Sequence, residues 1–105
     1  MKYTATDINV LSFAYNGDML NLLYEAEGTE KTLLISEEQI MSALLDIGYC
    51  SAVAPEDHDI LLQVPEVGTG NPEFAWVGLE YFVKQNLDAE MAEKIVLNHL
   101  NAVTA

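Results

Sequence analysis

The dipeptide Asn16-Gly17 constrains the fold of this chain more than any other feature of the sequence. It is the strongest short signal for a β-hairpin, because both central positions of a type I′ turn need a positive φ. Pairing outward from a two-residue turn gives one aromatic and aliphatic face across both strands, and this consistency supports the register. The predicted pairs on that face are Tyr15 with Asp18, Phe13 with Leu20, Leu11 with Leu22, and Asn9 with Tyr24.

Beyond this hairpin the sequence predicts a third strand, a helix and a fourth strand. Gly28 marks a second turn, and residues 31–35 form the third predicted strand. Ser36 begins the first helix, where Gln39 three residues later completes a capping box. Residues 59–64 are the fourth predicted strand, which ends at a proline.

The segment 72–86 is so apolar that it fits either a strand or a helix. An Asn-Pro pair at its start is typical of a helix N-terminus. Glu73, Glu80 and Lys84 fall on one narrow stripe only if the segment is helical. We therefore predict a helix over residues 72–86 that is apolar around the rest of its circumference.

A last helix is predicted over residues 89–103, with Asp88 as its N-cap. The order of elements is then β-β-β-α-β-α-α, which indicates an α+β fold in which a small, mostly antiparallel sheet packs against three helices. A chain of 105 residues has the size of one domain, so we expect a single acidic α+β domain over residues 1–105.

Surplus apolar surface on the helices predicts self-association, most simply as a two-fold homodimer. A four-stranded sheet covers one side of each helix, which leaves a larger apolar patch than monomers usually expose. Aromatic residues anchor protein interfaces, so we expect the contact in the aromatic part of the segment 72–86. The residues expected there are Phe74, Trp76, Tyr81 and Phe82.

The balance of charge excludes several classes of partner. The chain has 17 acidic residues against four lysines and no arginine, which gives a net charge of −13. Direct nucleic-acid binding needs clustered cations that neutralise phosphates, and an anionic membrane surface repels such a chain. No apolar run approaches the ~20 residues that cross a bilayer, and no signal peptide follows Lys2. We therefore expect no direct nucleic-acid or membrane partner, and a cytoplasmic location.

Two segments resemble ligand sites. Asp57-His58-Asp59 is the most metal-like cluster, but neighbouring residues on an extended chain point to opposite sides, so at most the two aspartates converge. The loop Gly68-Thr69-Gly70 lacks the lysine and the further glycine of a phosphate-binding loop. A solvated loop explains both segments better, so we predict no metal and no cofactor.

Two single residues, His99 and Cys50, are candidates for a catalytic group. His99 lies on the apolar arc of the last helix, where a histidine usually belongs to the core. Cys50 ends the first helix, and the negative C-terminal end of a helix opposes formation of a thiolate. We therefore predict no catalytic residue.

The acidic residues are unevenly distributed along the chain. Between Lys31 and Lys84, the 52 intervening residues hold nine acids and no lysine. We expect these carboxylates to dock on a basic surface of another protein, as a nucleic-acid mimic does on a nuclease, restriction enzyme, CRISPR effector or transcription factor, or as an immunity protein does on a nuclease toxin. The residues expected to carry the docking are Glu37, Glu38 and Asp46 on the first helix, and Glu56, Asp57 and Asp59 on the loop that follows it.

Two other function classes remain open. The chain fits an oligomeric structural or adaptor domain whose charge serves only solubility. It also fits a small enzyme or ligand-binding domain that uses His58, His99 or Tyr81. Capture of a nucleic-acid-handling partner favours docking, and self-association alone favours the adaptor.

Overall fold

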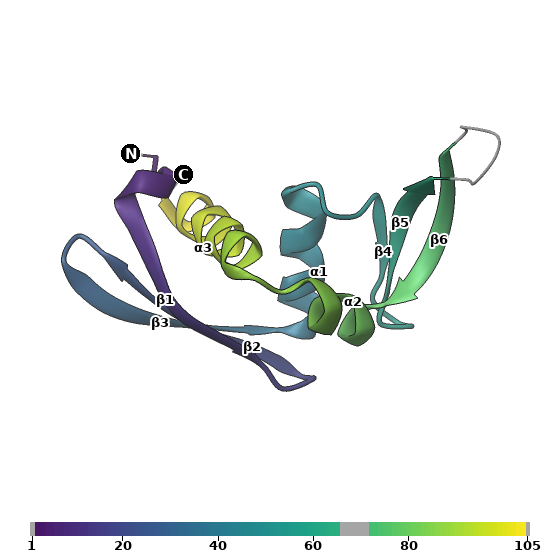
Figure 1. The fold of residues 1–105 in the computed structure, drawn as a ribbon, viewed down its shortest axis with the longest axis horizontal. Coiled ribbons are helices and arrows are strands. Elements are labelled where there is room, and N and C mark those ends of the chain that lie inside the picture. The colour runs from purple at the N-terminus through teal and green to yellow at the C-terminus, as the bar shows by residue number, and fades with distance from the viewer. Residues whose placement is uncertain (1, 66–71, 105) are drawn as a thin grey trace.

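The N-terminal part of the chain folds into an antiparallel sheet of three strands in the order β1-β2-β3 (Figure 1). The computed structural model describes residues 2–65 and 72–104. The predicted hairpin and third strand are confirmed. A short 3₁₀ turn, η1 (Ala5–Asp7), leads into β1 (Ile8–Tyr15), which is followed by β2 (Met19–Ala26) and β3 (Thr29–Ser36).

The tight two-residue turn of this sheet lies between β2 and β3. Glu27 and Gly28 have φ angles of 54° and 78°, and Ala26 pairs directly with Thr29 across them. Two successive positive φ angles are the signature of a type I′ turn. The type I′ geometry that was predicted for the turn at Asn16-Gly17 is therefore found in the turn between β2 and β3.

The first turn is wider than predicted. Tyr15 pairs with Leu20, so four residues lie between these paired positions in place of the predicted two. The Asn16 side chain causes this, because its Oδ1 accepts hydrogen bonds from the N–H groups of Asp18 at 3.1 Å and Met19 at 2.9 Å. The predicted register is therefore wrong by two residues at this turn.

A bulge next to Val10 shifts the β1–β2 register once more, and beyond it Val10 pairs with Tyr24. One extra residue in a strand moves the following side chains to the other face. Because of the bulge, the side chains of Val10 and Ile8 lie on the face of the sheet to which regular alternation had assigned Leu11 and Asn9. Ile8 is buried in the core, and Leu11 is exposed.

The helix caps predicted at Ser36 and Asp88 are confirmed. In front of α1 (Glu37–Asp46), the Ser36 hydroxyl accepts a hydrogen bond from the Gln39 N–H at 3.5 Å, and Gln39 Oε1 accepts one from the Ser36 N–H at 2.9 Å. In front of α3 (Ala89–Thr104), Asp88 Oδ1 accepts a hydrogen bond from the backbone N–H three residues on, at 2.8 Å. These caps satisfy N–H groups that the first turn of a helix leaves free.

A second antiparallel sheet, in the order β4-β5-β6, holds the fourth predicted strand. β5 (Asp59–Pro65) confirms that strand, and it lies between β4 (Ala52–Ala54) and β6 (Pro72–Gly78). The predicted helix over residues 72–86 is wrong for its first half, which is β6. Only the second half is helical, as α2 (Leu79–Asn86).

The order of strands and helices matches the predicted α+β arrangement, but the strands form two sheets of three strands where one sheet of four was predicted. In Figure 1, α3 lies over the first sheet, and α1 stands between the two sheets. One buried cluster joins them, since it includes Leu22 of β2, Ile60 of β5 and Ile95 of α3. No helix in the described ranges is long and apolar enough to cross a membrane.

The molecule is elongated. Its extents are 49 × 27 × 23 Å, and its radius of gyration is 14.8 Å, against about 13 Å for a typical domain of this length. Figure 1 shows the cause: the second sheet projects past the helices. Its strands therefore offer more surface than strands of a centrally packed sheet.

Candidate functional site

Four segments that are distant in sequence bring acidic side chains to one edge of the molecule, the lower edge in Figure 1, beside α2. The β4–β5 turn meets the start of α1, because His58 Nδ1 hydrogen-bonds Glu37 Oε2. The same turn meets the start of α2, because the Leu79 N–H donates to the His58 carbonyl at 2.8 Å. We call the carboxylates gathered here the acidic end, and they are Asp18, Glu37, Glu38, Glu56, Asp57, Asp59 and Glu80.

The β4–β5 turn owes its shape to a positive φ at its last residue. Ala54 pairs with Asp59, and the Asp57 N–H donates to the Ala54 carbonyl at 3.1 Å. His58 has a φ of 56°, which reverses the chain back into β5. This reversal directs the His58 carbonyl to α2 and its ring to α1.

The first hairpin turn also belongs to this end of the molecule. Glu80 approaches it so closely that a Cβ at Gly17 would lie 2.9 Å from Glu80 Oε1. Burial, and then the nearby charges of Glu37, Glu80 and Asp18, raise the pKa of Tyr15 to about 12. Negative charge from three chain segments therefore acts on one phenol.

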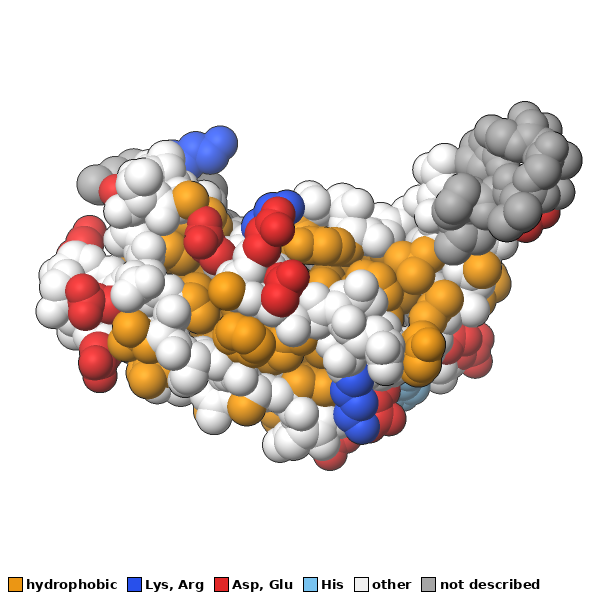
Figure 2. All heavy atoms as spheres, viewed as in Figure 1, with side chains coloured by type: hydrophobic (Ala, Val, Ile, Leu, Met, Phe, Trp, Pro, Cys, Tyr) orange, Lys and Arg blue, Asp and Glu red, His pale blue; other side chains and the backbone are white. Residues whose placement is uncertain are grey.

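Most of these carboxylates face solvent. Glu38, Glu56 and Asp57 are exposed, Asp59 is half-buried, and the Glu37 side chain is 22% exposed beneath His58. Glu80 pairs with Lys84 at 3.0 Å, one helical turn along α2. In Figure 2, acidic side chains, a histidine and a lysine gather at the lower edge of the molecule, next to α2.

Asp46 lies away from the other predicted docking residues. It occupies the C-terminal end of α1, which lies about 13 Å along the helix axis from Glu37. There its Oδ2 accepts a hydrogen bond from the Asn98 side chain of α3 at 3.5 Å. The structure therefore gathers five of the six predicted residues and leaves Asp46 apart.

Asp18 and Glu80 are the members of the acidic end that the sequence did not single out. Glu80 was assigned to the polar stripe of a helix, and Asp18 to a hairpin turn. Their proximity to Glu37 arises from tertiary contacts between segments more than 18 residues apart. No pattern of neighbouring residues in the sequence predicts this proximity.

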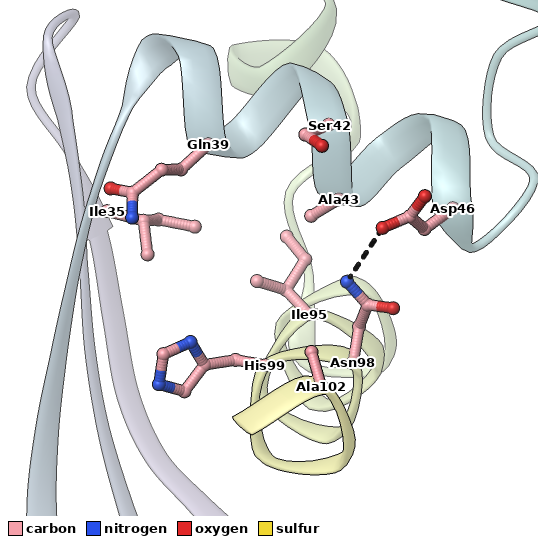
Figure 3. Close-up of a pocket in the computed structure, with 9 residues that line it drawn as sticks. All are labelled: Ile35, Gln39, Ser42, Ala43, Asp46, Ile95, Asn98, His99 and Ala102. Carbon is pink, nitrogen blue, oxygen red and sulfur yellow. Dashed lines mark hydrogen bonds between the residues drawn. The ribbon is translucent and has the colours of Figure 1, made fainter. Parts of the chain in front are cut away.

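A pocket of about 200 Å³ lies between α1, α3 and the end of β3 (Figure 3). His99 extends from α3 towards Ile35, and the Asp46–Asn98 hydrogen bond closes the opposite side. Pockets that bind small organic ligands usually have 300–1,000 Å³, so this one is small for such a ligand. His58 and Tyr81 are not among its lining residues, so the three residues of the enzyme hypothesis do not share it.

Three of the four residues predicted for self-association are exposed. Phe74 and Trp76 of β6 are 56% and 53% exposed, and Tyr81 of α2 is 65% exposed. Phe82 is instead in the core at 8% exposure, where its ring meets Tyr49 edge-on at 6.4 Å between centroids. The exposed aromatic surface thus consists of the other three.

The remaining candidate sites have different surroundings. Among the residues that the structure describes, no group of three or more His, Cys, Asp and Glu side chains is arranged to hold a metal ion. Cys50 is buried, and burial raises the pKa of its thiol, which favours the protonated, unreactive form. Gly68-Thr69-Gly70 lies outside the described residues.

Comparisons of the chain with protein-family models, with curated proteins and with solved structures gave no match. The chemistry of the surfaces is therefore argued from their residues. Exposed carboxylates accept hydrogen bonds and ion pairs from lysine and arginine side chains, and those bonds are stronger than neutral ones. The acidic end has five residues of this exposed kind, Asp18, Glu38, Glu56, Asp57 and Glu80, and it is suited to a cationic partner.

Proposed function

We propose that the protein is a non-enzymatic, acidic protein-binding domain whose acidic end docks on a basic surface of another protein, one that otherwise holds nucleic acid. The observation that carries the proposal is the convergence of chain segments that are distant in sequence: the charges of Glu37, Glu80 and Asp18 act on Tyr15, and Glu37 also hydrogen-bonds His58 of the β4–β5 turn. The proposed site of action is the cytoplasm, where the buried Cys50 stays reduced.

Electrostatics support this role. Carboxylates held on one surface produce a potential that steers a cationic partner and raises the association rate. Glu38, Glu56 and Asp57 are exposed and stand on two elements fixed to each other by the His58–Glu37 contact. Fixed positions lower the entropy lost on binding, so they favour recognition over simple solubility.

The test is a capture experiment with the tagged wild-type chain and one charge-reversal variant. The acidic-end variant combines Glu38→Lys, Glu56→Lys and Asp57→Lys. Because all three side chains are exposed, the variant should fold normally. We expect the wild-type chain to capture a nucleic-acid-binding protein from its native host, duplex DNA to release that protein, and the variant to capture at least tenfold less.

A matched control is available at the β2–β3 turn, away from the acidic end. Glu25, Glu27 and Glu30 lie around the β2–β3 turn and are exposed. Reversing these three to lysine changes the net charge from −13 to about −7, as the acidic-end variant does, because each reversal adds two units. The control should capture the partner as the wild type does. Equal loss in both variants, or capture that DNA does not reverse, would contradict docking through the acidic end.

A further inference from the structure

The outer edge of β6 is open. β6 pairs with β5 on one side, and the described part of the chain places no strand on its other side (Figure 1). An open edge presents backbone N–H and C=O groups that pair with another strand. Natural edge strands usually prevent such pairing with charged side chains, bulges or a covering segment. The charge in β6 is one glutamate, Glu73, at its second position.

The open edge adjoins an apolar face. Side chains alternate along a strand, so Phe74 and Trp76 point to the same side of β6, and both are more than half exposed. Trp76 pairs with Leu61, which extends this surface onto β5. The other side of β6 faces the core, where Val77 is partly buried. An edge and an aromatic face together provide both backbone and side-chain contacts for a further strand.

We propose that two copies of the chain dimerise by antiparallel pairing of β6 with β6, about a two-fold axis at Ala75. Ala75 is the midpoint of the seven-residue strand, so this register pairs the strand over its whole length. It sets Phe74 of each copy opposite Trp76 of the other. Two cross-strand aromatic pairs then form on one face, and the two three-stranded sheets become one sheet of six strands.

The charges of β6 select the same register. With Ala75 on the axis, Glu73 stands opposite Val77 of the other copy, and the two Glu73 residues lie about 13 Å apart. That separation exceeds the screening length of about 8 Å at physiological salt. A register centred on Glu73 would instead set two carboxylates face to face, which destabilises a sheet.

The acidic ends of the two copies also stay apart in this dimer. Asp59 pairs with Gly78, at the far end of β6 from Glu73. Antiparallel pairing puts the two Gly78 residues at opposite ends of the paired β6 strands. A chain of net charge −13 can therefore associate through this edge without bringing its acidic ends together.

Sedimentation equilibrium measures the association. At about 100 μM, where a micromolar complex is mostly formed, we expect a mass of twice 11.6 kDa. The variant Phe74→Ser/Trp76→Ser should have the mass of one chain. A matched control, Leu34→Ser/Tyr81→Ser, removes two equally exposed apolar side chains outside β6 and should remain a dimer.

A disulfide tests the register directly. Residues opposite each other in an antiparallel pair have Cα atoms about 4.5–5.5 Å apart, a separation that a disulfide spans. Ala75→Cys should therefore form a covalent dimer under mild oxidation, whereas Asn21→Cys, exposed on β2, should not. A wild-type mass of one chain at every concentration would overturn the proposal. A dimer in which Ala75→Cys does not cross-link, or cross-links no better than Asn21→Cys, would overturn it too.

Discussion

At the scale of single residues, Tyr15 is the side chain most sensitive to the charge of the acidic end. Its hydroxyl donates a hydrogen bond to the Gly17 carbonyl at 3.1 Å, so the phenol is held inside the first turn. Burial and then the charges of Glu37, Glu80 and Asp18 raise its pKa from 10.0 to about 12. Ionising this phenol would add a negative charge where several already lie.

The raised pKa predicts a loss of stability in alkali. The folded chain holds the Tyr15 proton more tightly than the unfolded chain, so the contribution is complete below pH 10 and is lost as the pH rises to about 12. Tyr15→Phe should weaken this dependence and remove the tyrosine with a pKa of about 12 from an absorbance titration. The control Tyr81→Phe leaves the first turn unchanged. Identical alkaline melting curves for wild type and Tyr15→Phe would refute the assignment.

At the scale of elements, sequence patterns predicted what depends on neighbours in the chain. The capping box of Ser36 and Gln39 and the cap at Asp88 mark helix starts because their hydrogen bonds span three residues. The strand at β5 followed from its alternating pattern. Most of the residues of the acidic end were also named from the sequence, because Glu37 and Glu38 follow the predicted helix cap at Ser36, and Glu56 and Asp57 lie in the loop before a predicted strand.

What the sequence did not predict depends on contacts between distant segments. β4 is three residues long, and it is a strand only because Val53 pairs with Ile60. Apart from Glu73, β6 is apolar, so its two-residue period was hidden, and α2 begins after Gly78 without a side-chain cap. The bulge next to Val10 depends on how β1 pairs with β2. The wide turn at Asn16 is an exception, because its hydrogen bond from the Met19 N–H to Asn16 Oδ1 is local, and the Asn-Gly signal for a tighter turn outweighed it in the prediction.

The two confirmed caps should differ in strength. The bond to Asp88 is 2.8 Å and involves a carboxylate at a helix N-terminus, while the bond from the Gln39 N–H to Ser36 is 3.5 Å. Asp88→Ala should therefore cost about 1–2 kcal/mol of unfolding free energy, and Ser36→Ala about 0.5–1 kcal/mol. Urea denaturation measures both, and the reverse order would show that cap geometry does not govern these helix starts.

At the scale of the whole molecule, charge and shape set the behaviour. A net charge of −13 on an elongated chain repels itself, and the acidic end concentrates that repulsion where four segments meet. The exposed edge of β6 and the acidic end lie on different parts of the molecule. The proposed self-association and the proposed docking use separate surfaces, so neither would block the other.

Self-repulsion predicts that salt stabilises the fold. Raising sodium chloride from about 10 mM to 150 mM shortens the screening length from about 30 Å to 8 Å, so the melting temperature should rise by a few degrees. The acidic-end variant should show a smaller rise. Magnesium, calcium or zinc at matched ionic strength should add nothing further. A saturable effect of any of these ions at micromolar concentration would indicate a metal site.

The salt dependence of the association rate tests docking through the acidic end most directly. Stopped-flow mixing with the partner released by duplex DNA gives this rate at several ionic strengths. The proposal predicts a steep fall with salt for the wild type and for Glu25→Lys/Glu27→Lys/Glu30→Lys, and a slower, nearly flat rate for Glu38→Lys/Glu56→Lys/Asp57→Lys. Equal rates and equal salt slopes in the wild type and the acidic-end variant would contradict it.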